Sequence, residues 1–517
     1  MKLAILPIIA FSFVPLAWSQ ASAVASVVDG LAQPRVAPGG GASIYGSFPT
    51  GSRSDFAVTF GGVSAYITFV ANDGKINRCF EIDVQVPTEI SAGAANVVVS
   101  YRGAAIAPFS VTVVPLDPVM SLDPFFTFLH TSGVSATPTA PAAPGETITT
   151  FMTGLGATSP TVPTGAGVTD FTPTASPVTV TVGGQPSPQV KFAGRYPING
   201  ISPSLDYQVS FVVPSGLPNG PAPVIVSIGG VNSNTQTLFI GTSALPNPPV
   251  VTAAVNGASF SSTTLIVPGS FVSVFGSGFG TQDNLSAFPS TQVNGISVLF
   301  NGQPAPIFHL IASAGQINVL APAQLLTQET VHPIAIVVQN QNGPSKAKFQ
   351  SAGAAGPGIF AVPDPSNASH HIAAALLANT AWYILPASLA QTLGLPSCSG
   401  RSVASACGQP AKRGDFVQLY TTGLGLATPN SDPNGTPLGT GQVAPANGVP
   451  LYTTVAVPIV SVGGQPVTVV FSGIAPGFAG LYQVNFQIPQ SVTPGDYVPV
   501  TIAMPGSIMD TATLAIQ

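Results

Sequence analysis

The sequence predicts an all-β protein made of several β-sandwich domains in tandem. Three observations predict it. An eight-residue strand pattern occurs four times, tight-turn signals separate many short apolar segments, and charged residues make up only 6% of the chain. The 55 glycines and 53 prolines stand where turns between short strands need them, so the chain is ordered and not a flexible polar tract.

The repeated pattern alternates apolar and polar residues and ends in a proline. Alternation with a period of two indicates a strand with one buried face, and the proline marks its end because it cannot donate to a sheet ladder. The four copies are residues 80–87, 207–214, 315–322 and 482–489.

Three other landmarks recur in a fixed order around this strand. Each unit opens with a Pro-Gly or Arg-Gly turn, a strand and a glycine-rich loop, at residues 38–46, 144–156, 268–280 and 413–425. A second strand then runs into a two-residue turn at Gly61-Gly62, Gly183-Gly184, Asn301-Gly302 and Gly463-Gly464. Such pairs favour tight hairpins because both central residues need positive φ. A closing strand follows each octamer, at residues 97–101, 224–228, 334–338 and 498–502.

These landmarks divide the chain into four units of six or seven short strands, which is typical of an immunoglobulin-like β-sandwich. We expect domains at residues 24–115, 116–242, 252–360 and 361–517, with a proline-rich linker at 243–251. The second and fourth units share a longer glycine-rich loop. The first and third units share a short segment before the opening turn, Val28-Asp-Gly30 in one and Val255-Asn-Gly257 in the other. The predicted fold is therefore a tandem array of four immunoglobulin-like β-sandwich domains arranged as a duplicated two-domain module.

Two further local features can be read from the sequence. Tyr207 and Tyr482 stand two residues before a buried-looking valine, as a tyrosine-corner residue would, whereas Phe80 and Gly315 at the equivalent positions of the other two units break that analogy. A helix is expected at residues 372–378 and, on a weaker signal, at 386–393, both within an insert that opens the last unit.

The N-terminus predicts export. Lys2 precedes a short apolar run, and small residues at Ala17 and Ser19 suit signal peptidase. We expect a signal peptide over residues 1–19, with cleavage after Ser19 or Ala23, and a secreted or cell-envelope protein without a membrane span. A membrane anchor is the alternative, although the run is brief for a span.

The three cysteines suit one local disulfide. Cys398 and Cys407 are nine positions apart in a turn-rich loop, so we expect them to be bonded in an oxidising compartment. Cys79 is left over and is expected to be a buried apolar residue, with a reactive thiol as the alternative.

The sequence offers little catalytic or metal chemistry. His370 and His371 are the one local concentration of histidines, and neighbours on a strand point to opposite faces. Calcium would need Asp415, Asp432 and Asp496 to converge, and this stays open. We therefore expect no catalytic residues, cofactor or metal site, with a paired-carboxylate glycosidase as the alternative. With 13 lysines and arginines and no basic stripe, nucleic acid is an improbable partner.

A binding surface is the alternative to a purely structural role. The loops at residues 158–176 and 427–455 are long and rich in Thr, Pro, Gly and Asn. Trp382, Tyr383 and Tyr452 are the candidate ligand-contact aromatics, since their rings can face sugars. Otherwise these loops are the ordinary edges of decorated sandwiches.

The landmarks resemble those of the IPT/TIG immunoglobulin-like domains, closest over residues 267–280 and 298–306. Residues 252–517 also resemble the uncharacterised C-terminal domain of acidobacterial (Solibacter-type) exported proteins, through the segments 256–260, 315–318, 357–360 and 475–484. Residues 24–242 look like a diverged second copy. The resemblance implies a binding or spacer module and brings no catalytic residue with it.

These observations favour a non-catalytic exported bacterial protein with a structural, adhesive or ligand-binding role at the cell surface or outside the cell. The expected partners are an extracellular glycan or a protein. The alternative is a carbohydrate-binding or carbohydrate-processing accessory protein.

Overall fold

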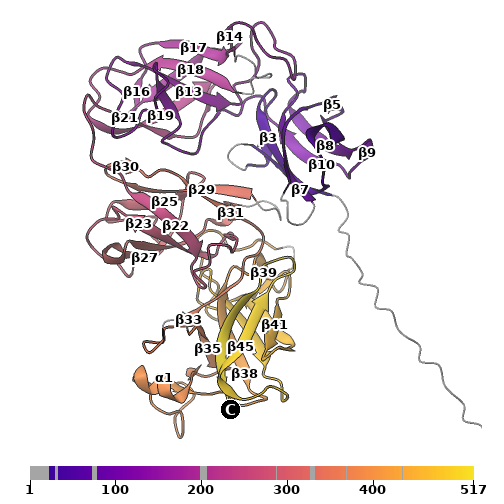
Figure 1. The fold of residues 1–517 in the computed structure, drawn as a ribbon, viewed down its shortest axis with the longest axis vertical. Helices are drawn as coiled ribbons and strands as arrows, with labels where there is room; N and C mark the ends of the chain where they lie inside the picture. Colours follow the sequence, from indigo (N-terminus) through magenta and orange to yellow (C-terminus); the bar gives the residue numbers. More distant parts are fainter. Residues whose placement is uncertain are drawn as a thin grey trace, which may run out of the picture.

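The computed structural model describes residues 23–517 except 30–32, 73–77, 198–205, 287, 326–331, 368–369 and 433–434. Eight sheets pair into four sandwiches, each around its own hydrophobic core. In Figure 1 the first sandwich stands beside the second, the second lies above the third, and the fourth lies below the third with the C-terminus at its lower end. The expected signal peptide at residues 1–19 lies outside the described residues.

The first sandwich packs a four-stranded sheet against a six-stranded one. In sheet order, the first sheet holds β1 (Ala23–Val28), β3 (Gly41–Pro49), β7 (Arg78–Gln85) and β6 (Tyr66–Asn72). The second holds β2 (Arg35–Val36), β10 (Phe109–Val113), β8 (Gly93–Tyr101), β4 (Phe56–Phe60) and β5 (Val63–Ser64), with β9 (Ala104–Ala105) beside β8.

The second sandwich repeats this plan. One sheet holds β11 (Val119–Met120), β13 (Thr147–Thr153), β18 (Tyr207–Val212), β17 (Val190–Arg195) and β14 (Thr172–Pro173), with β12 (Phe128–His130) beside β13. The other holds β16 (Gln185–Pro186), β15 (Val178–Val182), β19 (Gly220–Ile228) and β20 (Val231–Asn232), with β21 (Gln236–Ile240) beside β19.

The third sandwich has a four-stranded and a six-stranded sheet, like the first. One holds β22 (Val250–Asn256), β23 (Phe271–Ser277), β28 (Gln316–Leu320) and β27 (Ile307–Ile311). The other holds β24 (Gln292–Val293), β25 (Ile296–Phe300), β29 (His332–Asn340) and β30 (Gly343–Pro344), with β26 (Gln303–Pro304) beside β25 and β31 (Lys348–Ala352) beside β29. The 3-10 turns η1 (Arg53–Asp55), η2 (Ala312–Ala314) and η3 (Ala323–Leu325) lie in the first and third sandwiches.

The fourth sandwich is the largest. Its wider sheet holds β37 (Cys407–Gln409), β36 (Trp382–Ile384), β35 (Ala375–Leu377), β38 (Phe416–Thr422), β44 (Tyr482–Gln487), β43 (Val469–Ile474), β40 (Tyr452–Thr454) and β39 (Ala427–Pro429), with β32 (Gly358–Ile359) beside β38. The other holds β33 (Ala361–Val362), β34 (Ile372–Ala373), β46 (Asp510–Ile516), β45 (Gly495–Ala503), β41 (Ile459–Val462) and β42 (Gln465–Pro466).

The repeated octamer forms the equivalent inner strand of every sandwich, which confirms the all-β repeat. Strands β7, β18, β28 and β44 each lie between the strand that follows the opening turn and the strand that follows the hairpin. Their alternate apolar residues are buried in the cores, with Ile82, Val209, Ile317 and Val484 at 0% exposure. The alternation therefore placed one face of each strand inward, as the period of two requires.

The four two-residue hairpin turns are also confirmed. Each joins a core strand to a short strand, in the pairs β4–β5, β15–β16, β25–β26 and β41–β42. Both central residues have positive φ in every copy; Gly184 and Gly464 each have a φ of 77°. These are the backbone angles that glycine and asparagine adopt most cheaply.

The stronger of the two expected helices is wrong. Residues 372–378 contribute β34 and β35 instead, because Ile372 pairs with Thr513 of β46 and residues 375–377 pair with β38. Completing two sheet ladders outweighs the helix propensity of an alanine-rich segment, which is only a weak preference. The weaker helix is confirmed as α1 (Ala387–Thr392), which follows Pro386.

We predict that Gly184→Val and Gly464→Val each destabilise their own sandwich by roughly 1–3 kcal/mol, because a β-branched residue is strained at positive φ. No atom lies within 4 Å of a Cβ built at either glycine, so the strain comes from φ alone. Calorimetry should show each change lowering one thermal transition. Gly184→Asn and Gly464→Asn are the matched controls, since asparagine tolerates this conformation. A single transition shifted equally by both valine variants would contradict independent unfolding of the two modules.

Candidate functional site

The third and fourth sandwiches meet where the opening turn of one faces the glycine-rich loop of the other. The amide of Phe271, after the Pro268-Gly269 turn, donates to the hydroxyl of Thr422 at 3.0 Å. That hydroxyl donates to the carbonyl of Gly480, also at 3.0 Å. The amide of Gly356, in the joint between the two sandwiches, donates to the carbonyl of Gly423 at 2.9 Å. Backbone groups from both sandwiches therefore fix this contact.

The first and second sandwiches meet in the same way. The amide of Gly41, which follows the Pro38-Gly39 turn, donates to the hydroxyl of Thr153 at 2.8 Å. The amide of Asp117, in the joint, donates to the carbonyl of Gly154 at 2.9 Å. Thr153 and Thr422 hold the same place in the glycine-rich loops, so the duplication extends to the contact between the paired sandwiches.

The glycines of these loops are required by close backbone approach. A Cβ on Gly423 would lie 2.1 Å from the carbonyl oxygen of Gly356, and a Cβ on Gly154 would lie 1.7 Å from that of Asp117. Both glycines have a φ of 76°. Glycine is therefore needed at each position for space as well as for conformation.

Asn256 ties the start of the third sandwich to the same joint. This side chain is buried, with 3% exposure. Its amide nitrogen donates to the carbonyl of Gly356 at 3.1 Å, and its oxygen accepts from the amide of Ala258 at 2.9 Å. The Asn-Gly-Ala-Ser-Phe motif thus fastens the start of the third sandwich to the joint.

Each glycine-rich loop is also held by a buried tyrosine of the octamer. The hydroxyl of Tyr482 donates to the carbonyl of Gly425, and the hydroxyl of Tyr207 donates to that of Gly156. Burial raises the pKa of both phenols, so both remain donors at neutral pH. Each tyrosine thus braces the glycine-rich loop that follows the opening strand of its own sandwich.

A cavity of about 690 Å³ lies behind this contact, between the third and fourth sandwiches. Its walls are mostly aliphatic, and the described residues that line it include no charged side chain. The walls include Val267, Pro268, Leu320, Leu424, Leu426, Leu438, Val455, Ile474, Tyr482 and Met504. Leu426 and Val455 are 57% and 61% exposed, so the cavity opens to solvent past an apolar rim.

The corresponding space in the first module is smaller, about 270 Å³, and the side chains of Arg195 and Tyr207 are part of its lining. Arg195 is only 2% exposed, and its guanidinium carbon lies 4.1 Å from the centre of the Tyr207 ring. The guanidinium also donates to the carbonyl of Gly39 and, at 3.3 Å, to the Tyr207 hydroxyl. A cation–π contact and two hydrogen bonds therefore hold it in place.

The two long loops singled out in the sequence close over these cavities. In the second module, the Thr440 hydroxyl accepts from the amide of Ala323 at 2.7 Å and donates to the side-chain oxygen of Gln324 at 2.6 Å. In the first module, the Thr164 hydroxyl accepts from the amide of Thr88 at 2.8 Å and donates to the carboxylate of Glu89. In each module, a threonine of the long loop is thus hydrogen-bonded to the segment that follows the octamer strand of the preceding sandwich.

The candidate ligand-contact aromatics do not come together. Trp382 and Tyr383 lie on β36, whereas Tyr452 lies on β40, five strands away in the same sheet or roughly 24 Å. Trp382 and Tyr452 pack against the core of the fourth sandwich, and the indole of Trp382 donates to the carbonyl of Ser402 at 3.1 Å. A single aromatic platform made of all three is therefore incompatible with the sheet order.

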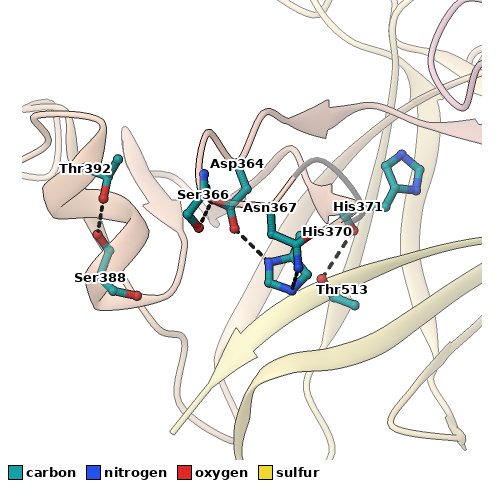
Figure 2. Close-up of polar contacts among 8 residues, drawn as sticks. All are labelled: Asp364, Ser366, Asn367, His370, His371, Ser388, Thr392 and Thr513. Atoms are coloured by element: carbon teal, nitrogen blue, oxygen red, sulfur yellow. Dashed lines mark hydrogen bonds and ion pairs between the residues drawn. The ribbon is translucent and has the colours of Figure 1, made fainter.

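His370 belongs to a compact polar loop of the fourth sandwich (Figure 2). Its Nδ1 lies 2.7 Å from the carboxylate of Asp364, and the side-chain amide nitrogen of Asn367 donates to its Nε2 at 2.9 Å. His371 lies apart from this group in Figure 2. Its Nδ1 is 2.9 Å from the carbonyl oxygen of Thr511. Both ring nitrogens of His370 are engaged, which suits a structural role.

Other chemistry-bearing residues are dispersed. The sulfur atoms of Cys398 and Cys407 are joined in a disulfide with a Cα–Cα distance of 5.2 Å, whereas the side chain of Cys79 lies outside the described residues. Across the described parts of the chain, no three His, Cys, Asp or Glu side chains gather closely enough to hold a metal ion, and Asp415 instead caps the amide of Lys412 at 2.8 Å. None of the helices described is long and apolar enough to cross a membrane.

Sequence reasoning found the loops but missed the cavity behind them. The signal was available in the aligned modules, where Phe192-Ala-Gly194 matches Phe471-Ser-Gly473. The next residue is Arg195 in one copy and Ile474 in the other. That difference accompanies the smaller cavity in the first copy and the larger cavity in the second.

Comparisons with known proteins support no family assignment. No protein-family model matches the chain, and no curated protein matches it. Among solved structures, the chain is similar to the full extracellular region of plexin A4 at 11% identity and a TM-score of 0.18, over 98% of this chain and 31% of that one. The chain thus spans about a third of that plexin.

Two bacterial structures are similar over more of their own length. One is SGBP-B of the Bacteroides ovatus mixed-linkage glucan utilization locus, in complex with a mixed-linkage heptasaccharide, at 10% identity and a TM-score of 0.14, over 88% of this chain and 87% of that one. The other is SGBP-B from a complex xyloglucan utilization locus in Bacteroides uniformis, at 15% identity and a TM-score of 0.16, over 65% of this chain and 100% of that one. With TM-scores this low, the assignment of immunoglobulin-like sandwiches rests on the sheets and cores themselves.

We predict that Gly423→Ala loosens the contact between the third and fourth sandwiches. Gly464→Ala is the matched control, because its φ is 77° and no atom lies within 4 Å of its Cβ. The control should lose about 1–2 kcal/mol from backbone strain alone, whereas Gly423→Ala should lose more. Urea unfolding measures the difference, and small-angle scattering should show a larger maximum dimension for Gly423→Ala alone. Equal losses with unchanged scattering would contradict the role of close approach.

The loop of Asp364 should contribute to stability in a defined pH window. Hydrogen bonds from Ser366 and His370 lower the pKa of Asp364 to about 2, below its value of about 3.9 in an unfolded chain. The contribution is therefore fully present above about pH 4 and is lost as the pH falls through about 2. The difference in unfolding free energy between the unaltered protein and Asp364→Asn should shrink over that window. Ser366→Ala removes one of these hydrogen bonds, so it should raise the pKa of Asp364 and move the window to higher pH. A difference in unfolding free energy that does not vary with pH would contradict this prediction.

Proposed function

We propose that this chain is a non-catalytic exported protein that binds a ligand at the cell surface or outside the cell, in the cavity between its third and fourth sandwiches. The observation that carries this proposal is the cavity itself, with about 690 Å³ of space behind an exposed apolar rim. Small-molecule sites typically enclose roughly 300–1,000 Å³, have mostly apolar walls and lie at domain interfaces.

Export is supported by the N-terminal sequence and by the disulfide. Residues 1–19 have the charge, apolar run and small residues of a signal peptide. A disulfide between Cys398 and Cys407 suits an oxidising compartment. Within this proposal, the domains span residues 24–115, 116–242, 252–360 and 361–517, the linker spans 243–251, and the units belong with the IPT/TIG-like and Solibacter-type modules that their motifs resemble.

Carbohydrate binding is the second candidate, and a feature of the outer sheet faces favours it. Aromatic residues stand in register with amide side chains of the octamer strand, as in the pairs Phe275 with Gln316 and Tyr420 with Gln483. A ring beside a carboxamide offers a stacking face and hydrogen bonds to a sugar. Tyr383 is 37% exposed and adds aromatic surface elsewhere on the fourth sandwich, whereas Trp382 and Tyr452 are partly buried against its core.

A ligand screen on the mature protein separates the two candidates. We expect thermal-shift screening of small molecules to find ligands that raise the melting temperature, because a ligand that binds only the folded state stabilises it. Leu426→Arg, at the rim, should abolish these shifts. Val470→Arg, which adds the same charge at a side chain that is 60% exposed and does not line the cavity, should keep them.

A glycan array on the same protein provides the contrary outcome. Glycan binding that is lost in Tyr420→Ala or Trp382→Ala, but kept in Leu426→Arg, would replace the cavity with the outer sheet face as the functional site. Absence of any ligand sensitive to Leu426→Arg would refute binding in the cavity.

A further inference from the structure

The joint between the paired sandwiches carries a leucine in the first module and an alanine in the second. The joint residues Asp117 and Gly356 each donate a backbone hydrogen bond to the glycine-rich loop of their own module, at equivalent positions. The residues just before them, Leu116 and Ala355, therefore hold equivalent places. An isobutyl side chain in the first module thus corresponds to a single methyl group in the second.

The side chain of Leu116 is wedged between two backbone segments of the second sandwich. A Cβ on Gly156, in the glycine-rich loop, would lie 2.6 Å from its Cδ2, and a Cβ on Gly229, in the turn after β19, would lie 2.8 Å from its Cδ1. Leu116 also packs against the core of that sandwich. Leu155 and Ile228 adjoin these glycines in the sequence, and in the described parts of the chain neither lines the smaller cavity. The leucine therefore closes this part of the space.

The second module leaves the equivalent place open. Strands β15 and β19 pair in the same register as β41 and β45, counted from the Gly-Gly turns, so the four residues around the leucine have defined counterparts. The counterparts of Leu155, Gly156, Ile228 and Gly229 are, in the same order, Leu424, Gly425, Met504 and Pro505. All four line the cavity of about 690 Å³, as does Ala355 itself. The larger cavity thus includes the place that an aliphatic side chain fills in the first module.

The walls at this place suit an aliphatic group. Ala355, Leu424, Met504 and Pro505 offer no side-chain donor or acceptor there, and no charged side chain is among the described residues that line the cavity. Tyr482 is 3% exposed, so its ring is already covered by the core. A hydroxyl or a charge at this depth would lose its hydration without a side-chain partner, whereas a methylene group gains free energy on leaving water.

Apolar surface continues from this place to solvent. Leu426 and Val455 form the rim, and Val457 and Ile459, which follow Val455 at alternate positions, are 63% and 64% exposed. A flexible chain can therefore lie against apolar groups from the core to the rim while a polar group at its other end stays in water.

We infer that the cavity between the third and fourth sandwiches binds a single aliphatic chain, of the alkyl or acyl class. Its methyl end takes the place that Leu116 fills in the first module, and its polar head group stays in solvent beyond Leu426 and Val455. This inference rests on the proposed ligand-binding function and specifies the class of ligand.

Straight-chain alcohols test the class on the full mature chain. Isothermal titration calorimetry with 1-hexanol, 1-heptanol and 1-octanol should give one site per chain, with an affinity that rises about fourfold for each added methylene, as burial of a methylene predicts. The diol 1,8-octanediol would bury its second hydroxyl, so it should bind at least about tenfold more weakly than 1-octanol. Affinity that does not depend on chain length, or that is equal for the alcohol and the diol, would overturn the inference.

Variants locate the site. Ala355→Leu gives the second module the residue of the first and should weaken 1-octanol binding at least about tenfold, because the new side chain enters the space that the ligand needs. Ala404→Leu is the matched control, since Ala404 is exposed and does not line the cavity, and it should leave binding unchanged. Leu426→Arg alters only the exposed rim and should also weaken binding. Thermal unfolding without alcohol checks that each variant is folded. Binding of 1-octanol that persists in both Ala355→Leu and Leu426→Arg would overturn the inference.

The outcomes separate this inference from the proposed function. If screening finds ligands that depend on Leu426 but bind Ala355→Leu as well as the unaltered protein, the cavity is a binding site and the inferred class is wrong. If neither the alcohols nor any screened ligand depends on Leu426 or Ala355, both the class and the proposed site are wrong.

Discussion

The close approach of a glycine-rich loop to the carbonyl of an inter-sandwich joint is the constraint on which the paired arrangement depends. The Gly356–Gly423 contact and its counterpart between Asp117 and Gly154 leave no room for a side chain. Tyr207 and Tyr482 hold these loops from behind, so the second and fourth sandwiches each present a fastened loop to the sandwich before them. The cavities lie where the paired sandwiches meet, so their positions follow from backbone packing and not from any particular lining residue.

Sequence alone predicted the parts of the fold that depend on local chemistry. Alternation placed the four octamers as inner strands, and Gly-Gly or Asn-Gly placed the hairpin turns, because both signals act within a few residues. The segment at residues 372–378 was misassigned because its partners, β38 (Phe416–Thr422) and β46 (Asp510–Ile516), lie far along the chain and outweigh its propensity for helix. Local preference decides a structure only where no distant partner competes.

The candidate site was less predictable, because it depends on contacts between backbone groups of different domains. Phe271 and Thr422 are 151 positions apart in the sequence, and no pattern of side chains predicts the hydrogen bond between the amide of one and the hydroxyl of the other. The long loops were visible as composition, but their latches through Thr164 and Thr440 appear only in three dimensions. Aromatic residues chosen for exposure and type did not converge, since residue type says nothing about strand order.

Duplication followed by divergence explains why the two cavities differ in size and lining. Both modules keep the glycines, the threonine of the loop and the buried tyrosine, which hold the sandwiches together. They differ at Arg195 and Asp206, whose places are taken by Ile474 and Leu481. The wall of the larger cavity leaves apolar surface facing water at Leu426 and Val455, which costs free energy in proportion to the area exposed. A ligand that covers this wall would recover that free energy and, by touching both sandwiches, would stabilise the contact between them. The residues that the two modules share therefore maintain the architecture, whereas the residues at which they differ are the ones available to determine function.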